Sequence, residues 1–296
     1  VRDDLFGLPG KWEKRKRGPD HGISITLIPL HEQFDVSILR FTQRLCSRIC
    51  AIIMNLNPQL HISSFRFSMP KTYTAAVVGA GGGGRASMKG VSDSTRYNLH
   101  AVADLDSDVR AEIREIYPGI QTFSNHREMF AQCPTDIVCV STWPPSHLEV
   151  TCDALNSLSL SGMVVEKPLA DNAADARTIC NLIREKKLPV VVPHGLMASE
   201  HIDCIYAHVR AGELGELRLI EIQCTNWDII NAGIHWLNFV VNLVEEPFDH
   251  VLAACDKTTR TYRDDMQVET LSATTIQTKS GIRITMHLGD HVSVNG

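Results

Sequence analysis

Three glycines of this sequence, Gly79, Gly81 and Gly84, have the G-x-G-x-x-G spacing that can hold the pyrophosphate of a dinucleotide. They follow an apolar run, with Val77 and Val78, that is predicted to be a buried strand. The first glycine permits a tight turn, the second lets the backbone approach a phosphate, and the third allows close packing of helix on strand. The phosphate would face the free N–H groups of the helix N-terminus. Glycine-rich turns also serve loop flexibility, so the spacing alone leaves both interpretations open.

A carboxylate farther along the chain adds a second feature of a dinucleotide site. Asp104 ends the short predicted strand 99–104 and lies 20 residues beyond Gly84. In a βαβ unit, such an acid accepts hydrogen bonds from the adenosine ribose hydroxyls and repels a 2′-phosphate. The sequence therefore favours NAD over NADP as the cofactor. Asp104 could instead cap the following helix, 108–117, although Asp106 fits that role better.

Two more groups of polar residues directly follow predicted strands. After strand 136–141 comes a rigid turn, 141–147, whose hydroxyls can meet the ribose or the nicotinamide amide of a cofactor. After strand 162–165 comes Glu166-Lys167-Pro168, in which the lysine can project its ammonium into a cleft and donate to a substrate oxygen. From composition alone, a surface lysine at a strand end is the favoured interpretation.

The elements that must position these residues alternate between strand and helix from residue 73 onward. Strands are predicted at 74–79, 99–104, 136–141 and 162–165, and helices at 108–117, 125–133 and 147–158, the last capped by Ser146. This alternation predicts an α/β fold, a doubly wound parallel sheet with helices on both faces. In such sheets ligands bind outside the carboxyl ends of the strands, where all of the residues named above lie.

Length and composition limit the class of protein. A chain of 296 residues is long enough for about two domains. With 44% hydrophobic and 21% charged residues it fits neither a disordered nor a membrane protein, and a net charge of -5 indicates no nucleic-acid partner. Its 9 cysteines include no C-x-x-C pair, which favours a reducing compartment and hence a cytoplasmic location. No metal site is predicted, at Cys46 and Cys50 or elsewhere.

Together, the glycine loop, Asp104, the turn 141–147 and above all Glu166-Lys167-Pro168 resemble the Gfo/Idh/MocA oxidoreductase family, which includes glucose–fructose oxidoreductase and inositol dehydrogenase. The resemblance covers residues 72–296. It implies an N-terminal Rossmann domain and a C-terminal α/β domain, whose open, mainly antiparallel sheet covers the substrate and often mediates oligomerisation. It also implies these cofactor contacts: Gly79, Gly81, Gly82, Gly84, Arg85, Asp104, Ser141, Thr142, Pro144, His147, Glu166 and Lys167.

A later segment strengthens this resemblance. Residues 231–238 resemble the family's D-x-G-x-H active-site helix, with His235 at the histidine position and Asn231 at the aspartate position. His235 is therefore expected to be catalytic, the alternative being a buried helical histidine beside Trp236. An amide stays neutral and cannot take a proton, so Asn231 is expected to bind substrate, and an aspartate-assisted proton relay lacks its carboxylate.

Two weaker candidates for substrate contacts lie between the predicted domains and after them. His194 lies at the junction of the domains, where relatives place substrate contacts, and a linker histidine is an equally simple interpretation. Trp227 could present an aromatic face to a sugar or pack the second sheet. The strands of that sheet are predicted near 217–224, 248–255, 267–278 and 282–288.

The domain boundaries follow from these assignments. Met69 directly precedes the first clear strand and is expected to be a natural start, so residues 1–68 are an extension without an assigned function. Residues 69–193 are the predicted NAD-binding domain, and residues 194–296 the predicted domain for substrate binding and oligomerisation. Family members usually continue through more sheet and a closing helix, so the second domain is expected to be truncated.

The resemblance implies an NAD-dependent dehydrogenase that acts on a sugar, a polyol or a related hydroxylated small molecule. Lys167 would polarise the substrate oxygen while His235 removes the hydroxyl proton. A second interpretation is an NAD-dependent glycosidase of the same fold. A third is a non-catalytic NAD- or sugar-binding protein or an inactive fragment, which Asn231 and the early end of the chain suggest. A homo-oligomer formed through the C-terminal sheet is expected, with no membrane partner.

Overall fold

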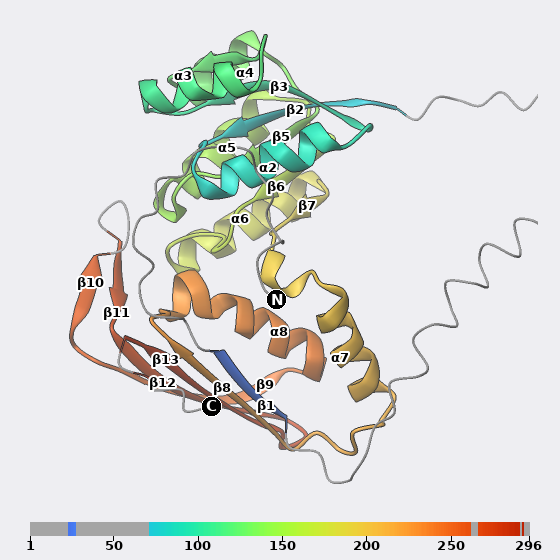
Figure 1. Cartoon of the computed structure of the whole chain (residues 1–296), viewed down its shortest axis with the longest axis vertical. Helices are drawn as coiled ribbons and strands as arrows, with labels where there is room; N and C mark the ends of the chain where they lie inside the picture. The colour runs from blue at the N-terminus through green and yellow to red at the C-terminus, as the bar shows by residue number, and fades with distance from the viewer. Residues whose placement is uncertain (1–22, 28–70, 262–265, 291, 293–296) are drawn as a thin grey trace, which may run out of the picture.

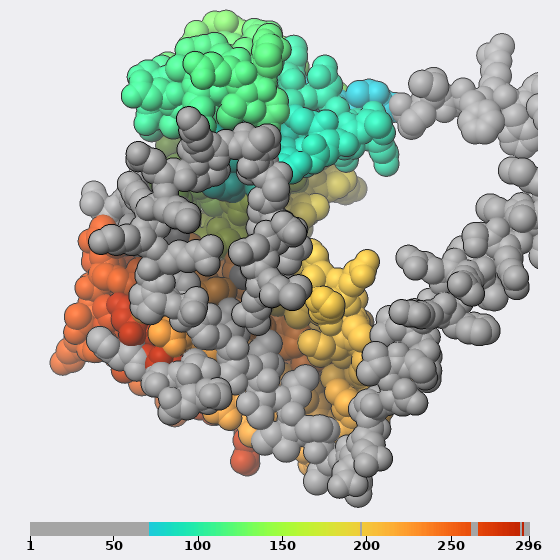
Figure 2. Space-filling view, in the orientation of Figure 1, coloured from blue at the N-terminus to red at the C-terminus, as the bar shows by residue number. Residues whose placement is uncertain are grey.

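The computed structural model describes residues 23–27, 71–261, 266–290 and 292. They form two lobes, each built around a large β-sheet (Figure 1). In the space-filling view, the cyan and green residues form the upper lobe and the yellow to red residues the lower one (Figure 2). Within the described part of the chain, no helix has the length and apolar content needed to span a membrane. The predictions for Met69, Cys46 and Cys50 concern positions outside the described residues.

The upper lobe is the predicted parallel sheet with helices on both faces, and its strand order is β4-β3-β2-β5-β6-β7. The chain runs outward from β2 through β3 to β4 and then crosses to β5 on the other side of β2. Ligands of doubly wound sheets bind where the strand order reverses in this way. The strands are β2 (Tyr73–Val78), β3 (Tyr97–Ala103), β4 (Gln121–Phe123), β5 (Ile137–Val140), β6 (Gly162–Val165) and β7 (Val190–Val191). The helices are α2 (Gly82–Asp93), α3 (Ser107–Ile116), α4 (His126–Gln132), α5 (His147–Ser157) and α6 (Ala173–Lys186).

Strand β2 shows why this sheet needs helices on both faces. Ala76 and Val78 pack into a core that includes residues of α4 and α5, whereas Val77 packs into a second core with residues of α2 and α3. Successive side chains of a strand point to opposite faces, and all three of these are buried. A strand that is apolar on both faces must lie between two layers, which is the situation of a central parallel strand.

The lower lobe is an open, mainly antiparallel sheet with the order β1-β8-β13-β12-β9, in which only β8 and β13 pair in parallel among the described strands. Helices α7 (Glu200–Arg210) and α8 (Ile234–Val244) cover one face (Figure 1). Strand β12 accordingly alternates between exposed and buried residues, as expected for a sheet covered on one side. The strands are β1 (Ile23–Leu27), β8 (Leu219–Thr225), β9 (Phe248–Cys255), β12 (Leu271–Thr278) and β13 (Arg283–Gly289).

The second sheet differs from the sequence prediction in two places. The single strand predicted at 267–278 is wrong, because the chain breaks at Thr270 into β11 (Gln267–Glu269) and β12, and β11 pairs instead with β10 (Thr259–Thr261). The Thr270 side chain donates to the carbonyl oxygen of Thr258 at 3.0 Å, which ties the break to the end of that hairpin. Of the predicted extension 1–68, residues 23–27 are described, and they pair antiparallel with β8 as β1.

Candidate active site

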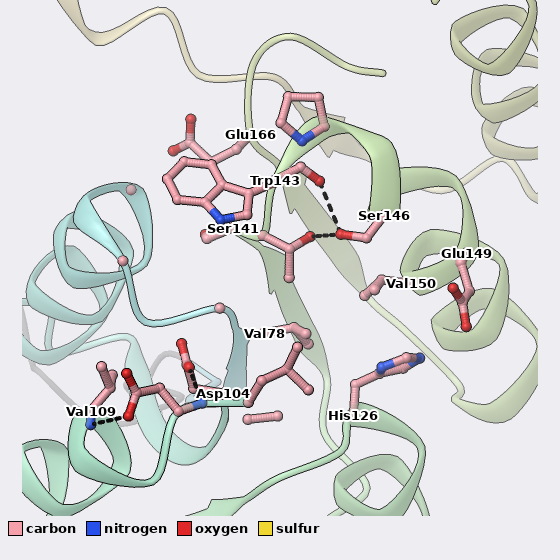
Figure 3. A pocket seen from close by; sticks show the side chains of 18 of the residues that line it. Val78, Asp104, Val109, His126, Ser141, Trp143, Ser146, Glu149, Val150 and Glu166 are labelled. Carbon is pink, nitrogen blue, oxygen red and sulfur yellow. Dashed lines mark hydrogen bonds between the residues drawn. The ribbon is translucent and has the colours of Figure 1, made fainter. Parts of the chain in front are cut away.

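A cavity of about 740 Å³ lies at the carboxyl ends of β2, β3, β5 and β6 (Figure 3). This volume is within the usual range for cofactor and small-molecule sites. Figure 3 shows Glu166 and Trp143 at one end of the cavity and Asp104 at another. Asn231, from the lower lobe, also lines it, so the cavity lies where the two lobes meet. The other predicted cofactor residues that line it are Gly79, Gly81, Gly82, Ser141, Thr142, Pro144 and Lys167.

The glycine loop brings the N-terminus of α2 against this cavity. Gly79 has a φ of 87°, and a Cβ there would lie 2.7 Å from the carbonyl oxygen of Ser141. A Cβ at Gly84 would lie 1.8 Å from the carbonyl oxygen of Gly79, so neither glycine has room for a side chain. A Cβ at Gly81 would meet no atom of the described residues within 4 Å. The first turn of α2 therefore faces open space, as the binding of a phosphate requires.

Asp104 lies between the glycine loop and α3. Its carboxylate accepts hydrogen bonds from the backbone N–H of Ala80 at 2.7 Å and of Asp106 at 2.9 Å. A carboxylate has about four acceptor sites, so these two bonds leave capacity for the hydroxyls of a ribose. Asp106 caps α3, as predicted, by accepting from the N–H of Asp108.

The turn after β5 is held together by its own hydroxyls. The hydroxyl of Ser146 lies 2.7 Å from that of Thr142 and 2.9 Å from the carbonyl oxygen of Trp143 (Figure 3). Ser146 stands at the N-cap position of α5, but its side chain makes no capping bond, because its hydroxyl points back into the turn. This part of the sequence prediction is therefore wrong, and Ser146 shapes the cavity wall instead.

His147 connects the two segments that carry most of the predicted cofactor contacts. Its side chain is fully buried, with Nε2 3.0 Å from the carbonyl oxygen of Thr142 and Nδ1 3.0 Å from that of Pro168. Burial lowers the pKa of His147, so its neutral ring donates to one of these carbonyls. The structure thus places His147 behind the cavity wall, where it aligns the turn after β5 with the segment that holds Lys167.

Glu166 and Lys167 point toward different sides of the cavity. The Glu166 carboxyl carbon would lie 3.1 Å from a Cβ at Gly83, so the acid packs against the N-terminus of α2. Burial raises the pKa of Glu166, against the opposing effect of Lys167. The Lys167 ammonium donates to the carbonyl oxygen of Asn231 at 2.8 Å, which links the upper lobe to the lower one.

The segment that carries Asn231 is held by a buried carboxylate. It is a π-helical turn, Ile229–Gly233, that leads into α8, and such turns are frequent at functional sites. Asp228 caps the turn by accepting from the N–H of Asn231 at 2.7 Å. Its side chain is 1% exposed, and the guanidinium of Arg260 lies 3.6 Å away. Sequence inspection missed Arg260, because nothing in its local pattern connects it with a residue so far away in the chain.

Two histidines of the lower lobe lie next to Lys167. The Nδ1 atoms of His194 and His235 are 3.2 Å apart, and their rings meet edge to face with centroids 5.1 Å apart. Burial, followed by the charges of Lys167 and His194, lowers the pKa of His235 to about 4. Burial and Lys167 also lower the pKa of His194. The structure therefore brings together four of the predicted residues: Lys167, His194, Asn231 and His235.

Two predicted site residues lie away from this group. The Arg85 guanidinium pairs with both carboxylate oxygens of Glu112 on α3, each at 2.7 Å, and does not line the cavity. Trp227 packs against the core of the lower lobe. Residues that sequence inspection missed also line the cavity: Leu105, Val109, Ser124, Asn125, His126, Arg127, Glu149 and Val150. Those at 124–127 follow β4, and the strand-end rule would have indicated them had a strand of 3 residues been recognisable.

His126, Glu149 and Asp153 form the one group of potential metal ligands found among the described residues. The guanidinium of Arg127 already contacts both acids, with Nη2 2.5 Å from a Glu149 oxygen and Nε 2.7 Å from an Asp153 oxygen. His126 also lies 2.8 Å from Asp153. Arg127 thus supplies the positive charge that these carboxylates need.

Residues 73–194 match the model of an oxidoreductase family, Gfo/Idh/MocA, that is described as an NAD-binding Rossmann fold. This segment contains the glycine loop, Asp104, the turn 141–147 and Lys167, whereas residues 231–238, which also carry the resemblance, lie outside it. Residues 73–194 are a Gfo/Idh/MocA domain. The upper lobe is accordingly an NAD-binding domain, as the sequence predicts.

Individual relatives agree with this assignment. The rhizopine catabolism protein MocA of Rhizobium meliloti is 24% identical over 158 residues, which cover 53% of this chain and 47% of MocA. The scyllo-inositol dehydrogenase of Lactobacillus casei, solved with NAD(H) and scyllo-inositol, has a TM-score of 0.64 at 16% identity over 74% of this chain and 70% of that one. The WlbA dehydrogenase of Bordetella pertussis, solved with NADH and UDP-GlcNAcA, has a TM-score of 0.63 at 16% identity over 74% and 71%. These structures show a shared fold, and the chain spans about half the length of the curated relatives it matches.

Proposed function

We propose that this protein is an NAD-dependent dehydrogenase that oxidises a C–OH group of a sugar, a polyol or a related hydroxylated small molecule. The observation that carries the proposal is the position of Lys167. Its ammonium is fixed at the cavity by the carbonyl oxygen of Asn231, and it is adjacent to a buried neutral histidine, His235. A cation beside a neutral base is the pair that the removal of a hydroxyl proton needs.

The cofactor would be held by the glycine loop, Asp104 and the turn after β5, and when bound it supplies the acceptor for the substrate's hydride. The residues of this chain would then handle the substrate oxygen. Lys167 stabilises the negative charge that develops on that oxygen. His235 accepts the hydroxyl proton, since a pKa of about 4 leaves its ring neutral at pH 7. Two solved relatives support a polyhydroxylated substrate: the scyllo-inositol dehydrogenase solved with scyllo-inositol and the WlbA dehydrogenase solved with UDP-GlcNAcA.

Lys167→Met tests this proposal. With a panel of polyols and aldoses, the natural chain should reduce NAD, and the variant should turn over roughly 10²-fold more slowly because the charge that stabilises the oxygen is lost. NADH affinity, followed by fluorescence transfer from tryptophan, should stay the same in both. Lys186→Met, an exposed lysine at the end of α6, is the matched control and should leave both measurements unchanged.

Three results would contradict the proposal in different ways. Undiminished turnover in Lys167→Met would remove the lysine from the reaction. Cleavage of a glycoside without net NADH would favour the glycosidase of the same fold. NADH binding by the natural chain without turnover of any compound in the panel would favour a binding protein.

A further inference from the structure

His235 is buried, although a base must exchange its proton with water after each reaction. Only 6% of its surface is exposed. Within the described part of the chain, the hydrogen bond recorded for its ring joins its Nδ1 to the Nδ1 of His194 at 3.2 Å. His194 is partly exposed, since it lies at the start of the turn Gly195–Met197 that leads out of the upper lobe. A route from His235 to solvent therefore runs through His194.

The two rings can share their protons in two alternative ways, and only one of them leaves His235 able to act as a base. Both pKa values are lowered, so at pH 7 each ring is neutral and carries one N–H. The Nδ1 atoms face each other, hence one ring must donate and the other must accept. If His235 donates, its Nε2 keeps a lone pair and can act as the base. If His194 donates, Nε2 of His235 carries the proton and cannot.

A carboxylate would normally be expected to orient such a base. Asn231 cannot fill this role, because an amide is neutral and does not take up a proton. The contacts of Asn231 to its neighbours use its backbone: the backbone carbonyl oxygen accepts from Lys167, and the backbone N–H donates to Asp228. The group that contacts Nδ1 of His235, where an orienting partner would act, is the His194 ring.

We infer that His194 is the positioning residue of His235: it accepts the Nδ1–H of His235 and passes the substrate's proton on to solvent. The inference rests on the proposed function, in which the nicotinamide takes the hydride. The substrate O–H bond breaks and its proton binds Nε2 of His235. The Nδ1 proton of His235 then moves to Nδ1 of His194, and the proton on Nε2 of His194 leaves to water. One proton enters the pair and one leaves it, so charge and atoms balance. Both rings then hold the opposite tautomer. The starting Nδ1–H form of His235 returns when the product has left, as Nε2 of His235 gives its proton to water, Nδ1 of His194 returns its proton to His235, and Nε2 of His194 takes one from water.

The arrangement can be tested in the full-length chain by labelling histidines with ¹⁵N and assigning their tautomers from long-range ¹H–¹⁵N correlations. Two substitutions separate orientation from transfer. His194→Asn places an amide oxygen near the position of Nδ1, where it can accept from His235 but cannot carry a proton. His194→Phe removes both functions and keeps a ring of similar size.

In the natural chain, His235 should be observed as the neutral Nδ1–H tautomer. His194→Asn should keep that tautomer but lower kcat, whereas His194→Phe should lose the tautomer and lower kcat by about 10²-fold, the scale of proton-transfer catalysis. KM should change little in either variant. The decrease of kcat at low pH depends on the charged groups next to this histidine pair. Among the described residues, these are Lys167 and the two imidazoles themselves.

His201→Asn, on the exposed side of α7, is the control and should alter neither kcat nor the His235 tautomer. An Nε2–H tautomer of His235 in the natural chain would overturn the inference, as would a tautomer that is unchanged in His194→Phe. A chain that binds NADH but oxidises no polyol would contradict the proposed function instead. In that case the tautomer of His235 alone tests the inference, and a dependence of that tautomer on His194 would still support the pairing of the two rings.

Discussion

The two lobes hold their functional residues by different means. In the upper lobe, the cavity wall is set by the backbone. Gly79 and Gly84 approach neighbouring carbonyls too closely for a side chain, and the ring nitrogens of His147 each lie 3.0 Å from a further carbonyl oxygen. In the lower lobe, the wall is set by side chains. Asp228 and Glu269 accept from the N–H groups of the π-helical turn, at 2.7 and 2.5 Å.

This difference determines how each lobe responds to change. Where the backbone leaves no room for a Cβ, the packing tolerates no added atom, so the cofactor side should fail abruptly when one of these glycines is replaced. A polar side-chain contact can be weakened by degrees, because neighbouring groups and water take over part of its role. The lower lobe should therefore lose stability and activity gradually.

Gly84→Ala should disrupt the upper lobe outright. The new Cβ would lie 1.8 Å from the carbonyl oxygen of Gly79, so α2 must move away from the loop. We expect a loss of about 3 kcal/mol or more in the free energy of unfolding, measured by urea denaturation. NADH binding should be lost with it, because the first turn of α2 no longer faces the cavity.

Gly90→Ala is the matched control in the same helix. A Cβ there meets no atom of the described residues within 4 Å, so the substitution should stabilise the chain by up to about 1 kcal/mol through helix propensity. If both variants bind NADH with equal affinity, the close contact of Gly84 does not determine the cofactor site.

The contrast between the lobes also explains which features the sequence could predict. The cofactor side could be predicted because its rules are local: glycine spacing, a strand end and the residue after it place Asp104 and Lys167 within a few positions. The segment with Asn231 and His235 could be recognised only through its resemblance to a family helix. The contacts that hold it could not, since Arg260 and Glu269 reach it from more than 25 residues away.

Short strands and contacts between distant residues account for the remaining differences between the sequence predictions and the structure. Strand β4 has 3 residues, too few for a hydrophobic period, so the cavity residues that follow it were not predicted. Arg85 and Trp227 have suitable side chains near suitable motifs, yet Arg85 pairs with Glu112 and Trp227 packs inward. Sequence spacing places a side chain on an element, but the neighbouring elements decide which way its polar atoms point.

The stability of the lower lobe should fall as the pH is lowered from 6.5 to 4.5. An unfolded histidine binds a proton below about 6.5, whereas burial, Lys167 and His194 lower the pKa of His235 to about 4. In this window the unfolded state binds more protons than the folded state, so the free energy of unfolding decreases with decreasing pH. The contribution of His235 to the loss between pH 6.5 and pH 4.5 should be about 2 kcal/mol.

His235→Asn removes that contribution together with any effect of His235 on its partner His194, whereas the carboxylates and the more distant histidines titrate equally in both chains. Urea denaturation of the two proteins at pH 6.5 and pH 4.5 measures it. The variant should lose less stability than the natural chain over this interval. Equal losses would mean that folded His235 takes up a proton as readily as the unfolded chain does, so that its pKa is not lowered by its surroundings.

Arg260→Met should weaken the lower lobe by degrees. Asp228 is 1% exposed and has Arg260 as its cationic neighbour at 3.6 Å, while Arg260 itself is 33% exposed. Because water still reaches the guanidinium, its loss should cost about 1.5 kcal/mol, less than the removal of a partner from a fully buried pair. Turnover should fall as well, since Asp228 holds the segment that fixes Lys167, whereas NADH affinity should not change.

Arg218→Met provides the comparison for this last substitution, because Arg218 pairs with Glu216 at the surface, where the two side chains are 74% and 71% exposed. Its loss should change the free energy of unfolding by less than about 0.5 kcal/mol and leave turnover intact.

If Arg260→Met behaves like Arg218→Met, the buried carboxylate of Asp228 does not need its cation, and the π-helical turn is held by its backbone. If instead NADH affinity falls together with turnover, the lobes are coupled through the contact between Lys167 and Asn231, and the division between them is less sharp than their contacts suggest.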